Sequence, residues 1–299
     1  MKILLTGATG FIGTNFVLNL HDKYEIVALV REGSNTSKIE SFCKVYRYDG
    51  KIESLIKIFK EEKFDGVVHL ATLYKANHTY NEIDSLIYSN IKFGVDILEA
   101  IKVIPVAFFI NTMTAFEYSN SDKYNPVNFY AATKHAFFDI IKYYSGVAST
   151  YFSHLMIFDT YGANDTRPKI FNLWKKIAKS GEVLEMSAGE QKIDISHVDD
   201  VINGFDILID LCVKKKVKNN QIFALESPKR YFLRKLAKIF EKGTNIKLNI
   251  KWGAKPYREN EIMNPVSTKR CKEIKKLPKW KQKINLEKGI EALWKNEKI

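Results

Sequence analysis

Three glycines near the start of the chain constrain its fold more than any other feature. Gly7, Gly10 and Gly13 form a G-x-x-G-x-x-G pattern between a short apolar run, Lys2–Thr6, and a segment with apolar residues at helical spacing, Phe11–Leu20. This order predicts a strand, a tight turn and a helix. Glycine permits the sharp turn and a close approach of the backbone to phosphate, and the start of a helix attracts negative charge. An ordinary glycine turn is the alternative, but the pattern and its context favour a dinucleotide-binding unit.

The composition limits the class of protein. With 299 residues and 45% hydrophobic content, the chain can form one large α/β domain or a dinucleotide domain with a smaller lobe. No apolar run reaches the roughly eighteen residues of a membrane span, and no signal peptide is expected. Cys43, Cys212 and Cys271 are far apart and form no C-x-x-C motif. We therefore expect reduced thiols in a cytoplasmic protein, and the scattered histidines predict no metal site.

The formal net charge of +13 leaves several kinds of partner open. Many of the basic residues fall between Lys269 and Lys283, where they could contact nucleic acid or form a solvated lysine-rich surface. No recognised nucleic-acid module accompanies them, so we expect no nucleic-acid partner. An acidic small substrate, such as a nucleotide sugar, fits the charge equally well.

The end of the second predicted strand, Glu25–Val30, indicates the choice of cofactor. In dinucleotide folds a carboxylate after this strand binds the ribose 2′-hydroxyl of NAD, whereas an arginine suits the 2′-phosphate of NADP. Arg31 occupies this position and Ser34 follows as a further donor, although Glu32 comes directly after the arginine. We favour NADP.

Other strand ends add candidate cofactor contacts. Asp49-Gly50 closes one predicted strand, and the next strand, Gly66–Leu70, closes in His69-Leu70-Ala71-Thr72, where small residues leave room for a cofactor across the sheet. His69 is expected to be a packed structural residue. Asn90, in a long helical segment, is either a surface residue or a buried one that fixes a local bend. The candidate cofactor contacts, apart from those of the helix described next, are Gly7, Thr9, Gly10, Phe11, Ile12, Arg31, Asp49, Gly50, Leu70, Ala71 and Thr72.

A tyrosine and a lysine provide the main candidate for catalysis. Tyr130 and Lys134 are four residues apart in a predicted helix and therefore share one face. An ammonium group near a phenol lowers the phenol pKa, which would let Tyr130 pass a proton at neutral pH. The helix follows a predicted strand, Val103–Ile110, that leads to Thr112.

These features together resemble the extended short-chain dehydrogenase/reductases, the NAD-dependent epimerase/dehydratase family. The resemblance covers nearly the whole chain and implies a Rossmann fold, that is, an α/β doubly wound parallel sheet, with a smaller interleaved C-terminal substrate lobe. It implies that Tyr130 donates a proton, that Thr112 hydrogen-bonds the substrate, and that Lys134 binds the nicotinamide ribose and lowers the Tyr130 pKa. The motifs that carry it include Gly7–Gly13, His69–Ala71, Asn90, Thr112, Tyr130 with Lys134, Tyr161-Gly162, His197–Asp200 and Leu286–Gly289.

Within this family, the residues that follow Thr112 distinguish the enzymes that catalyse different reactions. Sugar 4,6-dehydratases have an Asp-Glu pair there, whereas this chain has Met113 and Thr114, which disfavours dehydration. A tightly held NAD, as in the epimerases, fits poorly with Arg31. The sequence therefore predicts NADPH-dependent reduction of the C4 ketone of a nucleotide-linked 4-keto-6-deoxy or 3,6-dideoxy sugar, in lipopolysaccharide O-antigen or capsule synthesis. The alternatives are a nucleotide-sugar 4-epimerase with bound NAD and a non-catalytic NADP-binding sensor.

Several short stretches resemble the CDP-abequose and CDP-paratose synthases of this family, which favours a CDP-linked substrate. One is Arg258–Met263, where Arg258 is expected to bind phosphate. An arginine common in the family is replaced by Ile193, beside Lys192. The candidate substrate contacts are Thr72, Thr112, Met113, Thr114, Lys192 and Arg258.

The chain shows no clean domain boundary. We expect residues 1–165 to form the dinucleotide-binding domain, with 194–226 returning to it, and 166–193 and 227–299 to form the substrate lobe. The helices around Ile83–Leu98 and Tyr130–Tyr144 carry apolar stripes, and the adjacent Phe137 and Phe138 suggest a face left uncovered. In relatives these helices pair across a two-fold axis, so the resemblance implies a homodimer.

Overall fold

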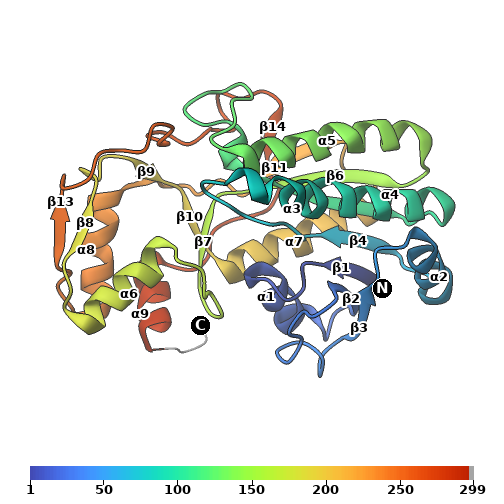
Figure 1. Cartoon of the computed structure of the whole chain (residues 1–299), viewed down its shortest axis with the longest axis horizontal. Helices are drawn as coiled ribbons and strands as arrows, with labels where there is room; N and C mark the ends of the chain where they lie inside the picture. Colours follow the sequence, from blue (N-terminus) through green and yellow to red (C-terminus); the bar gives the residue numbers. More distant parts are fainter. Residues whose placement is uncertain (296–299) are drawn as a thin grey trace.

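The computed structural model describes residues 1–295 and is organised around one eight-stranded sheet (Figure 1). Its neighbouring strands are all parallel, in the order β14-β11-β6-β5-β4-β1-β2-β3. The chain order reverses between β1 and β4, as in a doubly wound dinucleotide fold, which confirms the predicted fold class. The strands are β1 (Lys2–Thr6), β2 (Glu25–Arg31), β3 (Lys44–Tyr48), β4 (Gly66–His69), β5 (Phe108–Thr114), β6 (Tyr151–Ile157), β11 (Gln221–Ala224) and β14 (Ile274–Lys276).

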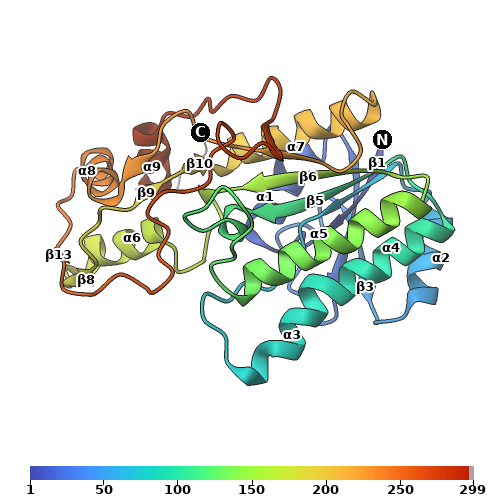
Figure 2. The same cartoon turned by 90° about the horizontal axis from the view of Figure 1, so that it is seen from above.

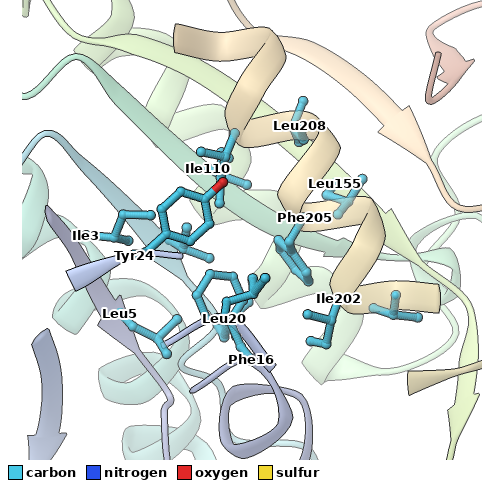
Figure 3. Close-up of a cluster of buried hydrophobic side chains, with 14 of the residues drawn as sticks. Ile3, Leu5, Phe16, Leu20, Tyr24, Ile110, Leu155, Ile202, Phe205 and Leu208 are labelled. Carbon is cyan, nitrogen blue, oxygen red and sulfur yellow. The ribbon is translucent and has the colours of Figure 1, made fainter. Parts of the chain in front are cut away.

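Helices cover both faces of the sheet. α1 (Phe11–Leu20) and α7 (Val198–Val213) pack on one face, where Phe16 meets Phe205 edge to face at 6.0 Å. Figure 3 shows these rings between the two helices and the sheet residues Ile3, Leu5 and Ile110. Burial of this apolar surface supplies the main stabilisation of the domain. The other face is covered by α2 (Ile52–Glu62), α4 (Phe93–Val103) and α5 (Phe129–Val147), with α4 and α5 running side by side (Figure 2).

The helix predicted around Ile83–Leu98 is interrupted by a local distortion. It consists of α3 (Ile83–Ile87), a π-helical turn (Tyr88–Lys92) and α4, and Asn90 lies within the turn. β5 begins at Phe108 and not at Val103 as predicted, because α4 extends to Val103 and Pro105 follows it. Within residues 1–295, no helix combines the length and the apolar character of a membrane span.

A smaller lobe lies beyond the carboxyl ends of the main strands and has its own core (Figure 1). Trp174 and Phe240 meet at 5.6 Å between its helices. β14, at the edge of the main sheet, falls within the range 227–299 that the sequence analysis assigned to this lobe. The lobe contains α6 (Ile170–Ser180), α8 (Leu233–Thr244) and α9 (Leu286–Lys295), and the short strand pairs of the chain are β7 (Asp159–Tyr161) with β10 (Ile195–His197), β8 (Leu184–Met186) with β13 (Ile250–Trp252), and β9 (Lys192–Ile193) with β12 (Tyr231–Phe232).

The two adjacent phenylalanines of α5 do not leave an uncovered face. Phe137 is fully buried against Gly94 and His69, and Phe138 is buried against His154. The expectation drawn from this pair is therefore wrong, because each ring packs against a different part of the same protomer. The apolar side chains that remain exposed near α3 and α5 are Tyr80, Ile83, Ile87, Tyr88, Tyr143 and Val147.

Candidate active site

One cavity of about 1970 Å³ lies at the carboxyl ends of the main strands and extends to α6 and to residues 255–262. Parallel strands bring the residues that follow them to one edge of the sheet, so distant segments of the chain meet there. Every residue that the sequence analysis singled out for cofactor or substrate lines this cavity: Gly7, Thr9, Gly10, Phe11, Ile12, Arg31, Asp49, Gly50, Leu70, Ala71, Thr72, Thr112, Met113, Thr114, Tyr130, Lys134, Lys192 and Arg258.

The glycine turn has the shape of a phosphate cradle. Gly7 has φ +69°, and a Cβ atom there would lie 2.6 Å from the Ala71 nitrogen, so a side chain is excluded. Gly10 precedes the first residue of α1, and no side chain caps this helix N-terminus. The exposed backbone at Thr9 and Gly10 therefore faces the cavity together with the positive end of the helix dipole. These features fit the diphosphate of a dinucleotide.

Arg31 lies where the adenosine ribose of such a cofactor would be read. It ends β2, pairs in register with Tyr48 on β3, and is exposed at the cavity. Within residues 1–295, no carboxylate forms an ion pair with its guanidinium group. Asp49 accepts hydrogen bonds from the Ser54 hydroxyl and the Lys51 backbone nitrogen, and these bonds lower its pKa. The site thus presents an unpaired cation beside an ionised carboxylate.

The three residues proposed for catalysis come from two neighbouring elements. Tyr130 and Lys134 lie one turn apart on α5, and Thr112 lies near the end of β5. The Lys134 side chain is 2% exposed, and burial lowers its pKa to about 8. The Thr112 hydroxyl donates to the His69 carbonyl oxygen at 3.0 Å. A buried amine, a phenol and a hydroxyl therefore meet at the same end of the cavity.

The pKa of Tyr130 differs from the sequence-based expectation. It is raised, chiefly by burial, and a hydrogen bond to Thr72 and the charge of Arg167 only partly oppose this. Tyr74 packs edge-on against the Tyr130 ring at 5.0 Å and contributes to its apolar surroundings. The expectation of a lowered Tyr130 pKa is wrong for this arrangement, because desolvation of the phenol dominates. Tyr130 remains protonated at neutral pH.

Two buried polar side chains beneath the cavity have structural roles. Asn90 accepts from the Leu73 backbone nitrogen at 2.7 Å and donates to the Thr133 hydroxyl at 2.9 Å, so it joins the segment after β4 to α5. His69 is bonded through Nδ1 to the Thr6 hydroxyl at 2.9 Å, and burial lowers its pKa to about 3. His69 is therefore neutral and packed, as expected.

Aromatic and basic side chains on separate loops, which the sequence did not predict, complete the cavity. Lys169, which precedes α6, lies 4.7 Å from the centre of the Tyr74 ring and 5.4 Å from that of Phe116. Arg167 stacks on Phe11 at 4.2 Å and forms a salt bridge with Asp165. These residues share no spacing pattern, so no local sequence signal predicted their place in the cavity.

The far end of the cavity belongs to the smaller lobe. Arg258 is exposed there, and among residues 1–295 no carboxylate pairs with it. Lys192 lies 5.4 Å from the Phe232 ring. Asp194 forms a buried salt bridge with Arg230 at 3.0 Å, which holds the segment beside Ile193 in place. Arg258 is therefore available to an anionic ligand.

We looked for a metal site among the residues that the structure describes. No group of three or more His, Cys, Asp or Glu side chains among them is placed to hold a metal ion.

Comparison with known proteins identifies the family to which this chain belongs. The family model described as NAD dependent epimerase/dehydratase family matches residues 3–222. Two CDP-abequose synthases are each 28% identical: that of Yersinia pseudotuberculosis, over 89% of this chain and 92% of the relative, and that of Salmonella muenchen, over 98% and 96%.

Solved structures share the fold at lower identity. UDP-glucose 4-epimerase of Thermotoga maritima, solved with UDP-glucose, has a TM-score of 0.84 at 20% identity and covers 99% of this chain and 98% of its own. UDP-glucuronic acid 4-epimerase of Bacillus cereus, solved with UDP-glucuronic acid and NAD, has a TM-score of 0.85 at 21% identity, with the same coverage.

Proposed function

Because the chain belongs to the NAD-dependent epimerase/dehydratase family, we propose that it reduces the C4 ketone of a nucleotide-linked sugar with NADPH. The proposed substrate is a 4-keto-6-deoxy or 3,6-dideoxy sugar used in surface polysaccharide synthesis, and CDP is the favoured nucleotide because the two relatives that are 28% identical over most of the chain are CDP-abequose synthases. The proposed working state is a cytoplasmic homodimer.

The observation that carries the choice of reaction is the end of β5. Dehydration needs further acid–base groups beside Thr112, and this chain has none there. Met113 is 2% exposed and packs in the core, and the Thr114 hydroxyl accepts from the Phe116 backbone nitrogen. Tyr130 is thus left as the proton donor, which suffices for the reduction of a ketone.

The proposed chemistry assigns one role to each residue. Bound NADPH would supply the hydride that reduces C4. Tyr130 donates its phenolic proton to the C4 oxygen as the carbonyl becomes a hydroxyl, and its raised pKa keeps this proton in place beforehand. Thr112 donates a hydrogen bond to the same oxygen, and the Lys134 ammonium holds the nicotinamide ribose.

Charge supports a diphosphate-linked substrate over a free sugar. Arg258 and Lys192 line the same cavity as Gly10 but come from segments far from the glycine turn in the sequence, which supports a second phosphate site. Replacing Arg258 with alanine should raise KM about tenfold to a hundredfold, because an arginine–phosphate contact contributes about 1.5–3 kcal/mol. Arg270→Ala, on an exposed arginine paired with Asp122, is the matched control and should leave KM unchanged.

The second candidate is a nucleotide-sugar 4-epimerase, favoured by the structural neighbours solved with UDP-sugars and NAD. The two are separated by incubating the purified protein with NADPH and CDP-, dTDP-, GDP- and UDP-linked 4-keto sugars. A reductase consumes NADPH in proportion to product. Tightly bound NAD in the purified protein, with conversion of UDP-hexoses in the absence of added cofactor, would instead establish the epimerase.

A further inference from the structure

Lys169 brings a positive charge from the smaller lobe into the candidate active site. It directly precedes α6, and its side chain is 31% exposed. Lys169, Tyr74 and Phe116 all line the cavity. The ammonium nitrogen of Lys169 lies 4.7 Å from the centre of the Tyr74 ring and 5.4 Å from that of Phe116. One cation therefore faces two aromatic rings that come from other parts of the chain.

The two rings belong to segments that follow neighbouring strands of the main sheet. Tyr74 follows β4, and Phe116 lies in a 3-10 turn (Ala115–Glu117) that directly follows β5. Their ring centres are 6.3 Å apart, and Tyr74 packs edge-on against the Tyr130 ring at 5.0 Å. The face of an aromatic ring carries partial negative charge, which attracts the C–H groups of a sugar ring. A sugar whose C4 oxygen reaches Tyr130 therefore lies beside an aromatic surface.

The hydrogen-bond donors of the Lys169 ammonium are not used by the protein. Oδ1 of Asp159 lies 4.0 Å from Nζ, which is beyond hydrogen-bond distance. Among residues 1–295, no other group forms an ion pair or a hydrogen bond with this nitrogen. An ammonium group has three N–H donors, and contact with aromatic faces leaves them free for oxygen acceptors. The oxygen atoms of a bound ligand can fill this role.

We propose that Lys169, Tyr74 and Phe116 form the subsite that holds the sugar. The Lys169 ammonium donates to a hydroxyl of the sugar, and the two rings pack against the C–H groups of the sugar ring. This inference rests on the proposed function, because the position of C4 at Tyr130 places the sugar beside the rings. Lys169 is then a specificity-determining residue that adds affinity only for ligands with a sugar, whereas Arg258 adds affinity for any nucleoside diphosphate.

The test compares the binding of a nucleoside diphosphate with that of its glucose conjugate. The protein is saturated with NADPH, and CDP and CDP-glucose are titrated by calorimetry. C4 of CDP-glucose already carries a hydroxyl, so NADPH does not reduce it. CDP, UDP, dTDP and GDP are first compared in the wild type, and the tightest of them is used with its own glucose conjugate. The ratio of the two Kd values isolates the contribution of the sugar.

Two variants should change this ratio. Lys169→Met keeps the length of the side chain but removes its charge and its donors, so CDP-glucose should bind about tenfold more weakly while the Kd of CDP stays unchanged. Lys169→Arg keeps the charge and the donors and should retain most of the affinity for CDP-glucose. Phe116→Leu removes one aromatic face and should weaken CDP-glucose alone, by about threefold. It also gives an independent measurement if Lys169→Met fails to bind NADPH.

The controls separate a sugar contact from other effects. Arg258→Ala should weaken CDP and CDP-glucose equally. Lys176→Met, on α6 with its side chain 73% exposed and outside the lining of the cavity, should change neither. Equal weakening of both ligands by Lys169→Met, or no change in either, overturns the inference. The expected loss for CDP-glucose alone, with no turnover of any keto sugar by the wild type, overturns the proposed function and leaves the sugar subsite standing.

Discussion

Thr112 and His69 are joined across neighbouring strands: the Thr112 hydroxyl on β5 donates to the His69 carbonyl oxygen on β4, at 3.0 Å. The hydroxyl proton is therefore engaged within the protein and must turn away from His69 to reach a substrate oxygen. This bond orients the Thr112 side chain. It also limits how much Thr112 can stabilise the transition state, because the bond to His69 must break first.

The first prediction concerns this hydroxyl. Thr112→Val should lower kcat about tenfold to a hundredfold with little change in KM, at the low end for loss of an oxyanion donor because the His69 bond is given up during the reaction. Thr112→Ser is the control and should retain most of the activity. Steady-state kinetics on the keto sugar decide this, and an unchanged kcat in the valine variant would remove Thr112 from the mechanism.

Lys134 should be destabilising in the free protein. Its pKa falls from 10.5 to about 8 on folding, so the unfolded chain binds the proton more tightly. The penalty is fully present below pH 8, where it amounts to roughly 3 kcal/mol, and it disappears as the pH rises to about 10.5. Lys134→Met should therefore be more stable than the wild type at pH 7 and lose most of this advantage by pH 10, while cofactor binding and turnover both fall.

Denaturant unfolding at the two pH values measures the effect on Lys134. Lys142→Met is the control, because Lys142 lies on the same helix with its side chain 50% exposed and paired with Asp139. A methionine variant at position 134 that is less stable than the wild type at pH 7 would contradict a penalty from burial.

The sequence predicted the fold well because periodicity and the glycine turn are local signals. It did not predict β14, a three-residue strand that lies at the sheet edge through pairing with β11. Nor did it predict the contact of Lys169 with Tyr74, since these residues meet only after two distant loops fold together. The predicted direction of the Tyr130 pKa shift was wrong for a related reason. Helical spacing predicts that Lys134 is a neighbour of Tyr130, but it does not predict how far burial removes the phenol from water.

Arg31 tests the choice of cofactor. The wild type should bind NADPH more tightly than NADH, and Arg31→Ala should narrow the difference by about tenfold because one phosphate contact is lost. Arg270→Ala serves as the control, because Arg270 pairs with Asp122 and is not among the residues that line the cavity. Isothermal titration with both cofactors measures the ratio. Equal affinities in the wild type would contradict the assignment of NADPH and favour the epimerase.

Assembly is expected to use the apolar side chains exposed near α3 and α5. Tyr80 is 82% and Tyr143 60% exposed, and Ile83 and Ile87 on α3 are each 38% exposed. We predict a homodimer by light scattering at micromolar concentration, with Ile87→Asp shifting it toward monomer. Val213→Asp places the same charge on an exposed apolar site at the end of α7 and should stay dimeric. A monomeric wild type would contradict this surface as an interface.

Deuterium transfer distinguishes whether hydride reaches C4 while Tyr130 supplies the proton. The protein is incubated with NADPH deuterated on the transferred position and a CDP-linked 4-keto sugar, and the product is analysed by NMR. We expect one deuterium at C4. Tyr130→Phe should form this product about a hundred to ten thousand times more slowly, whereas Tyr143→Phe, on an exposed tyrosine of the same helix, should form it at the normal rate. A product without deuterium, or an undiminished rate in the Tyr130 variant, would contradict the proposed mechanism.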